Sequence, residues 1–380
     1  MQSRRWDQVC STCMPMPHGS PRGRFLAAAA SVVLLPALFV SAVPATADQV
    51  PAGRTVYVTN SATHSGTANI IRFTVNRDGA LVPLDRVRAG HGARGMAITP
   101  DRRFAYVAAA DGNEIDGYRI GRDGSLSQFL TVSTPRPSGL VTSRDGRTLY
   151  VVNQVTATIT VFAVQSDGAL VQRAVVSTGG IAPKDLAVTP DGRFIYVGDT
   201  KRPVLTGFAV GSDGIPTRPV ARAGIGLFSG EVLVTRDGRF LYVVCTDTDD
   251  IFGFRIEGDG TLTEVSHLPA GERAEGAAIS PDGRLLYVAG SALEDNSGPI
   301  TGFTIGADGV LTPAGRPVLL HQPPTVAFAP DGKHLYATDF AENTITTFAV
   351  SSTGDLTTVK TQPSGGVEPG FQAVTLLRNR

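Results

Sequence analysis

Short runs of apolar and β-branched residues alternate with Asp-Gly pairs along most of the chain. Segments such as Leu149–Val152 and Ile159–Val164 combine valine, isoleucine and aromatic residues, a composition typical of β-strands. The Asp-Gly pairs between them allow the positive φ angles that tight hairpin turns require. The pattern predicts many short antiparallel strands and no long helix.

The strand pattern repeats seven times, and a tyrosine marks each copy. Consecutive tyrosines are 44–49 residues apart, and an aromatic residue follows each of them after 12 or 16 residues. Each copy divides into four strands, which we call a to d. In the fourth copy we expect them at residues Asp185–Val188, Phe194–Val197, Leu205–Val210 and Pro219–Ala223. The seven tyrosines are Tyr57, Tyr106, Tyr150, Tyr196, Tyr242, Tyr287 and Tyr336.

A four-stranded sheet with apolar residues on both faces cannot bury them alone, but seven such sheets around an axis can. The sequence therefore predicts an all-β fold, a seven-bladed β-propeller of four-stranded antiparallel blades, in a single domain over residues 48–380. The chain enters the first copy at strand b, so this copy lacks its own strand a. Phe371–Leu377 has the pattern of this strand. We expect this C-terminal strand to pair beside Val56–Thr59 and close the ring.

Residues 1–47 are predicted to be a signal peptide. A long apolar run, Phe25 to Val43, follows two arginines and ends at Ala45-Thr46-Ala47, the pattern of a cleaved export signal. The alternative is an uncleaved anchor. Cleavage predicts a secreted or extracytoplasmic protein with no membrane span, in which Cys245 has no partner for a disulfide.

Charge and motifs exclude several functions. The 34 basic and 34 acidic side chains balance, and no basic patch is visible, which argues against nucleic-acid binding. The chain has no phosphate loop, nucleophile elbow or zinc-protease motif, so we expect neither a cofactor nor a metal. We expect a monomer.

Strand direction locates the predicted site. If strands run antiparallel, every Asp-Gly turn falls on one face, and the varied b–c loops and d–a connections fall on the other, where function normally resides. A mixed charged rim there could hold a small polar or anionic ligand, a cell-wall polymer or an extracellular protein. The alternative is a ring of solvated charges. The candidate residues at the channel mouth are Arg94, Asn153, Lys184, Asp199, Glu231, Glu275, His321 and Asp339.

The sequence resembles the lactonase-like and YVTN-repeat propellers across residues 54–377. The features that carry the resemblance are the start Tyr57-Val58-Thr59-Asn60, the Pro-Asp-Gly-Arg turns and the entry through strand b. The resemblance implies catalysis at the channel mouth by a histidine, arginines and a glutamate, as in phosphogluconolactonases and fungal muconate cyclases. By blade count, none of these positions matches, and the catalytic residues stay unknown. We expect a ligand- or partner-binding module, and the alternative is a divergent lactonase-type hydrolase or muconate-type cyclase. The positions hold Lys184, Gly230, Thr246 and Pro324.

Overall fold

The structure, a computed structural model, describes residues 54–61, 67–291, 297–367, 369 and 375–378. These residues form 28 β-strands, and no helix occurs among them. The strands make seven separate four-stranded sheets, all with antiparallel neighbours. The predicted all-β, seven-bladed propeller is confirmed.

The blades are numbered from the N-terminal side. Blade 1 contains β28 (Thr375–Arg378), β1 (Arg54–Asn60), β2 (Asn69–Val75) and β3 (Leu81–Arg88); blade 2 contains β4 (Ala93–Ile98), β5 (Phe104–Ala109), β6 (Glu114–Ile120) and β7 (Leu126–Ser133); blade 3 contains β8 (Pro137–Thr142), β9 (Thr148–Asn153), β10 (Thr158–Val164) and β11 (Leu170–Ser177). Blade 4 contains β12 (Pro183–Val188), β13 (Phe194–Asp199), β14 (Val204–Val210) and β15 (Pro216–Gly224); blade 5 contains β16 (Ser229–Val234), β17 (Phe240–Cys245), β18 (Asp250–Ile256) and β19 (Leu262–Pro269). Blade 6 contains β20 (Gly276–Ile279), β21 (Leu285–Ala289), β22 (Ser297–Ile305) and β23 (Leu311–His321); blade 7 contains β24 (Val326–Phe328), β25 (His334–Asp339), β26 (Thr344–Val350) and β27 (Leu356–Pro363).

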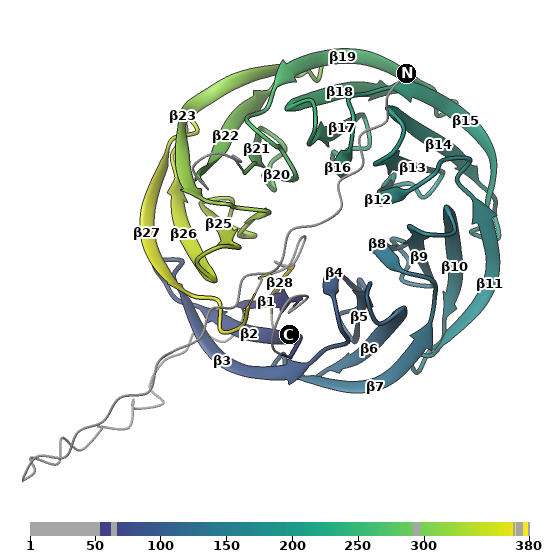
Figure 1. Cartoon of the computed structure of the whole chain (residues 1–380), viewed down its shortest axis with the longest axis horizontal. Coiled ribbons are helices and arrows are strands. Elements are labelled where there is room, and N and C mark those ends of the chain that lie inside the picture. Colours follow the sequence, from purple (N-terminus) through teal and green to yellow (C-terminus); the bar gives the residue numbers. More distant parts are fainter. Residues whose placement is uncertain (1–53, 62–66, 292–296, 368, 370–374, 379–380) are drawn as a thin grey trace, which may run out of the picture. The chain divides into compact units, whose positions relative to one another are not determined.

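The sheets surround a central axis with the first strand of each blade innermost (Figure 1). Apolar clusters fill the space between neighbouring blades, for example between blades 4 and 5, where Leu205, Val243 and Phe254 are buried together. Blade faces that no single sheet could bury alone are thus covered by the next sheet, which is the main source of stability in this fold.

The C-terminal strand closes the ring. Strand β28 pairs with β1 in antiparallel register, with Thr55 opposite Leu377 and Val56 opposite Leu376. The predicted closure is therefore confirmed, although the described strand begins at Thr375, and residues 370–374 of the expected strand lie outside the described residues. The first blade is built from both ends of the propeller.

The repeat tyrosines join each blade to the next. Each is buried, and its hydroxyl donates a hydrogen bond to the carbonyl oxygen of the glycine in the next blade's c–d turn. The bond from Tyr242 to Gly309 measures 2.8 Å, and the bond from Tyr336 to Gly79 measures 3.0 Å and crosses from blade 7 to blade 1. The repeat therefore places one buried polar link at every seam.

Replacing Tyr242 by phenylalanine should destabilise the protein by about 1–2 kcal/mol, because the buried Gly309 carbonyl would lose its donor. Tyr150 gives a matched comparison, since its bond to Gly214 is only partly buried and water can replace the hydroxyl. We expect Tyr150→Phe to lower the free energy of unfolding less than Tyr242→Phe in thermal or urea melts. Equal stability of Tyr242→Phe and the unchanged protein would contradict the role of these links.

Strand direction gives the propeller two different faces. Strand a begins and strand b ends on one face, which we call the mouth face, and all a–b and c–d turns lie on the opposite face, which we call the turn face. The loops over residues 59–70 and 289–300, which are four residues longer than the other b–c loops, connect strands at the mouth face. Their tips at residues 62–66 and 292–296 lie outside the described residues.

In the part of the chain that the structure describes, no helix is long and apolar enough to cross a membrane. Nor do three or more histidine, cysteine, aspartate or glutamate side chains converge there as a metal site requires. The expectation of a protein without metal or cofactor stays a prediction.

Candidate functional site

Three inner strands bring charged side chains together at the mouth face. Lys184 is the second residue of β12, Glu231 is the third residue of β16, and Glu275 directly precedes β20. The Lys184 ammonium forms an ion pair with a carboxylate oxygen of Glu275, and the two side chains are 14% and 19% exposed. The pair is therefore largely desolvated but still open to solvent.

A glycine lets the inner strands of blades 5 and 6 approach closely beside this ion pair. Gly230 holds in β16 the position that Lys184 holds in β12. A Cβ atom at Gly230 would lie 2.5 Å from the carbonyl oxygen of Glu275. That oxygen accepts a hydrogen bond from the Glu231 amide at 3.0 Å, so the inner strands of blades 5 and 6 are directly joined here.

The Lys184 ammonium also lies over an aromatic ring. The Nζ atom is 5.1 Å from the centre of the Phe228 ring, within the range of a cation–π interaction. Phe228 has a φ of 56°, a left-handed conformation that is uncommon for a bulky residue. The d–a connection before β16 thus holds the ring against the ammonium and restricts where Lys184 can point.

Two carboxyl groups in this cluster accept a hydrogen bond from the next inner strand. An Asp185 oxygen accepts from the Val232 amide at 2.9 Å, and a Glu231 oxygen accepts from the Ala277 amide at 2.9 Å. Asp185 and Glu231 occupy equivalent positions on β12 and β16. The cluster therefore contains one ammonium group, that of Lys184, beside three carboxyl groups.

Burial raises the pKa of Glu231 to about 8. This value already includes the Asp185 carboxylate, which also raises the pKa, the Ala277 amide and Lys184, which lower it, and Glu275, which raises it slightly. At neutral pH the Glu231 carboxyl is consequently protonated. Carboxyl groups whose surroundings separate their pKa values can serve as an acid and a base in one site.

Replacing Glu231 by glutamine should make the protein more stable at alkaline pH. The carboxyl is protonated in both states below its ordinary pKa of 4.5, but between 4.5 and about 8 only the unfolded chain releases the proton. Its contribution to stability is thus complete below pH 4.5 and lost as the pH rises to about 8. Glutamine has no proton to lose.

Between pH 5 and 8.5 the Glu231→Gln variant should gain at least ~1 kcal/mol over the unchanged protein, or roughly 2 °C in melting temperature. Glu264→Gln, at an exposed position of β19, is the control. Melting curves at several pH values measure the difference, and a pH-independent difference between Glu231→Gln and the unchanged protein would contradict the raised pKa.

Three of the predicted residues are buried within their own loops. Asn153 accepts a hydrogen bond from the Thr134 hydroxyl at 2.7 Å, and Asp339 accepts one from the His321 amide at 2.9 Å. Asp199 accepts hydrogen bonds from four backbone amides, those of Ile181, Ala182, Lys201 and Arg202. These side chains hold mouth-face loops in shape, and a ligand-binding role for them stays a prediction.

The remaining predicted residues, Arg94 and His321, lie on other strands than the cluster. Arg94 is the second residue of β4 in blade 2, where its carbonyl oxygen accepts a hydrogen bond from the Thr59 hydroxyl at 2.8 Å. His321 ends β23, the outermost strand of blade 6, and is exposed. Of the eight predicted residues, the structure therefore brings three together in one cluster: Lys184, Glu231 and Glu275.

Sequence reasoning missed two members of the cluster, Asp185 and Phe228. Asp185 could have been found, because it and Glu231 are acidic residues 46 positions apart at the same place in the repeat. Phe228 carries no comparable signal, since its contact with Lys184 depends on the shape of the loop before β16.

Comparisons with known proteins agree with the fold. A family model described as "Lactonase, 7-bladed beta-propeller" matches residues 46–218, 215–328 and 321–373. A 6-phosphogluconolactonase of Pectobacterium atrosepticum is 30% identical over 97 residues, which cover 25% of this chain and 29% of that protein. An equivalent protein of Erwinia tasmaniensis is 28% identical over the same length, with the same coverage. The match thus spans less than a third of these relatives.

Two solved structures resemble the whole propeller. A putative 6-phosphogluconolactonase of Bacteroides fragilis has a TM-score of 0.71 and 21% identity, covering 88% of this chain and 99% of that one. A periplasmic gluconolactonase of Pseudomonas aeruginosa has a TM-score of 0.74 and 20% identity, covering 86% and 99%. At these identities the likeness shows the fold.

Proposed function

The chain belongs to the lactonase family of seven-bladed β-propellers, and from this premise we propose that it hydrolyses a sugar lactone at the mouth of its central channel. The observation that supports the proposal most is the Lys184–Glu275 ion pair beside the protonated Glu231. Family membership favours this lactonase alternative over the binding module that the sequence led us to expect.

In the proposed reaction the Glu275 carboxylate takes a proton from water as the water oxygen bonds to the lactone carbonyl carbon. The carbonyl electron pair moves onto its oxygen, where the Lys184 ammonium stabilises the negative charge. Such preorganised charge stabilisation is usually the largest contribution to acyl-transfer catalysis. Lys184 suits this role because Phe228 and Glu275 hold it in place.

Collapse of the tetrahedral intermediate breaks the bond between the carbonyl carbon and the ring oxygen. The ring oxygen leaves with the proton of Glu231, whose other oxygen stays hydrogen-bonded to the Ala277 amide. The product is an open-chain hydroxy acid, and the proton held by Glu275 returns to Glu231 through solvent. General acid assistance of this kind typically contributes about 10²–10⁴-fold.

We propose an unphosphorylated lactone as the substrate. The cluster offers one ammonium group, which already pairs with Glu275, beside the Asp185 carboxylate and the uncharged, protonated Glu231 carboxyl. A phosphate dianion would meet like charge here, and like charges brought together cost binding energy. The periplasmic relative from Pseudomonas aeruginosa carries the name gluconolactonase, which is consistent with such a substrate.

The pH dependence of hydrolysis tests the acid role of Glu231. Because its pKa is about 8, kcat/KM for D-glucono-lactone should fall by about tenfold per pH unit above this value. A pH-stat measures the rate after subtraction of spontaneous opening. Glu231→Gln should be slow and lack this alkaline decline, whereas Glu264→Gln should keep it. A rate that keeps rising through pH 9 would contradict the assignment.

We also propose that the protein acts outside the cytoplasm. The predicted signal peptide over residues 1–47 lies outside the described residues, and the periplasmic location of the Pseudomonas aeruginosa relative supports export. The mass of the protein recovered from the extracytoplasmic fraction tests this directly, because cleavage before Asp48 removes 47 residues.

A further inference from the structure

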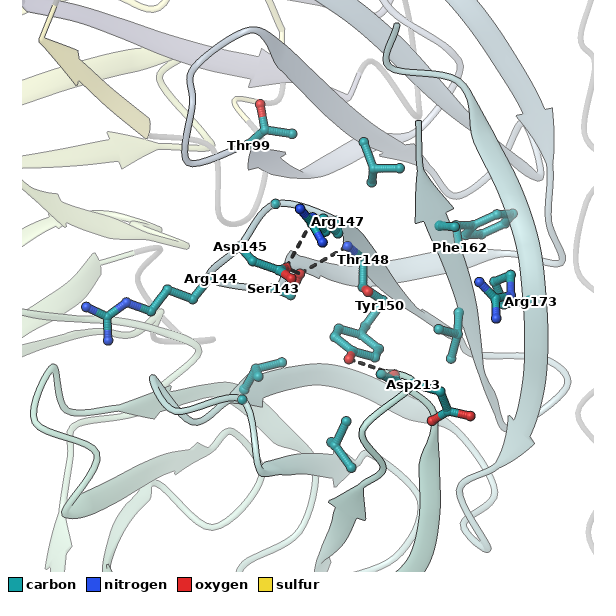
Figure 2. Close-up of a pocket in the computed structure, with 18 of the residues that line it drawn as sticks. Thr99, Ser143, Arg144, Asp145, Arg147, Thr148, Tyr150, Phe162, Arg173 and Asp213 are labelled. Carbon is teal, nitrogen blue, oxygen red and sulfur yellow. Dashed lines mark hydrogen bonds between the residues drawn. The ribbon is translucent and has the colours of Figure 1, made fainter. Parts of the chain in front are cut away.

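A cavity of about 1140 Å³ opens on the turn face, opposite the proposed lactonase site (Figure 2). It extends along blade 3 to the seam with blade 4, is bordered by the Asp-Gly turns of both blades, and is also lined by Asp101, Arg103 and Phe104 of blade 2. The turns of this face repeat the same Asp-Gly pattern, but the side chains beneath them differ from blade to blade. We call this space the turn-face cavity.

Three of the seven blades place a phenylalanine two residues before the repeat tyrosine, on the turn-face side of the strand. Phe104, Phe194 and Phe240 hold this position in blades 2, 4 and 5 and are buried. Each ring carries the preceding arginine at 4.8–5.0 Å from its centre, and in blades 4 and 5 that arginine also donates a hydrogen bond at 2.8 Å to a turn carbonyl of the next blade.

Blade 3 has Thr148 at this position, so no ring fills its seam. Blade 1 also has a threonine, Thr55, but there Arg72 compensates by donating a hydrogen bond to the Asp123 carbonyl at 2.6 Å. The residue of blade 3 equivalent to Arg72 is Val161, which is too short to do so. Blade 3 therefore has a small threonine where blades 2, 4 and 5 have a phenylalanine, and both Thr148 and Val161 line the turn-face cavity.

One arginine at this seam lacks the stacking partner of its equivalents in other blades. Arg147 corresponds to the stacked Arg193 and Arg239, but it has no ring beneath it, and its guanidinium has no hydrogen bond within the described part of the chain. Arg144 and Arg173 also line the cavity (Figure 2), and both are exposed. The guanidinium fork matches the two oxygens of a carboxylate.

The other polar groups of the cavity suit hydroxyl groups. Ser143, Gln165 and Ser166 line it, together with the carboxylates of the Asp-Gly turns. The Asp145 carboxylate is held by the Ser143 hydroxyl at 2.5 Å and the Arg147 amide at 3.0 Å, and these bonds lower its pKa. A ligand that presents both a carboxylate and several hydroxyls would use the arginines and these acceptors together.

We propose that the turn-face cavity binds a sugar acid, with a carboxylate on the Arg147 guanidinium and the sugar hydroxyls on the surrounding serine, glutamine and aspartate groups. Ligand pockets commonly measure about 300–1,000 Å³, so the cavity has room for a short acidic oligosaccharide. This site lies on the face opposite Lys184 and does not depend on the lactonase proposal.

Calorimetric titration of the purified protein with trigalacturonate tests the proposal, with maltotriose as the neutral comparison and sulfate as a simple anion. We expect trigalacturonate to bind at least ~10-fold more tightly than either. Arg147→Gln should weaken binding at least ~10-fold, because it removes a charge-assisted hydrogen bond. Arg284→Gln is the matched control, since Arg284 occupies the same turn position in blade 6 and should leave the affinity unchanged.

Thr148→Phe provides a second variant, because it restores the residue type of blades 2, 4 and 5. It should abolish trigalacturonate binding without lowering the melting temperature, and lactone hydrolysis should be unaffected. Unchanged affinity in Arg147→Gln and Thr148→Phe would overturn the proposal. So would equal binding of sulfate or maltotriose, or no binding of trigalacturonate at millimolar concentration.

Discussion

Replacing Lys184 by methionine is expected to lower kcat for lactone hydrolysis at least ~100-fold, because the developing oxyanion loses its cation. Methionine keeps the length and much of the apolar stem of lysine, so contact with Phe228 survives. Lys201→Met is the control, since Lys201 is exposed in a b–c loop of the same blade and should leave kcat unchanged. Initial rates on D-glucono-lactone measure the effect.

Loss of stability is the competing explanation for a slow Lys184→Met variant. The substitution leaves the largely desolvated Glu275 without its partner, and an unpaired carboxylate in such a place is destabilising. The double variant Lys184→Met/Glu275→Gln removes both charges and should regain the melting temperature but not the activity. A double variant that regains activity would exclude Lys184 and Glu275 from the chemistry.

Deleting residues 375–380 is expected to unfold the protein or to lower its melting temperature by 10 °C or more. The deletion removes β28, leaves β1 with an unpaired edge and takes the inner strand from blade 1. A loss of several kcal/mol is large against a total stability of about 5–15 kcal/mol. A shorter deletion of residues 379–380 leaves β28 intact and serves as the control.

Circular dichroism melts and size-exclusion chromatography measure this effect. The long deletion should give a broad, early transition or aggregation through the exposed edge of β1, while the short deletion should melt with the unchanged protein. An unchanged midpoint for the long deletion would show that the ring does not need its C-terminal strand.

The fold was predictable because its signals are local and repeated. Asp-Gly turns, β-branched strands and a tyrosine every 44–49 residues specify four strands per copy, and seven copies leave one way to bury both faces of every sheet. The reason for the tyrosine was not visible, because its partner, such as Gly309 for Tyr242, lies 67 residues away in the next blade.

The site was predictable in part. Lys184, Glu231 and Glu275 could be found because they lie at the start of strand a, and strand a begins at the channel mouth. Asn153 and Asp199 share that face, but their oxygens are engaged by loop groups, and only the folded loops show which acceptors are already occupied.

The turn-face cavity could not be predicted at all. Thr148 and Val161 are ordinary strand residues in the sequence, and the space that they leave exists only once blade 4 packs against blade 3. Such a cavity forms where side chains are too small to fill the space between two blades. It can therefore be recognised only when the neighbouring blade is in place.

The most direct test of lactone hydrolysis at the mouth face is the initial rate of the purified protein at pH 7 on D-glucono-lactone and on its 6-phosphate. We predict turnover of the unphosphorylated lactone above about 1 per second, a typical lower figure for enzymes, and a kcat/KM at least ~10-fold lower for the phosphorylated one. If neither lactone is hydrolysed faster than its spontaneous rate, the account is contradicted, and the hypothesis of a ligand- or partner-binding module is favoured instead.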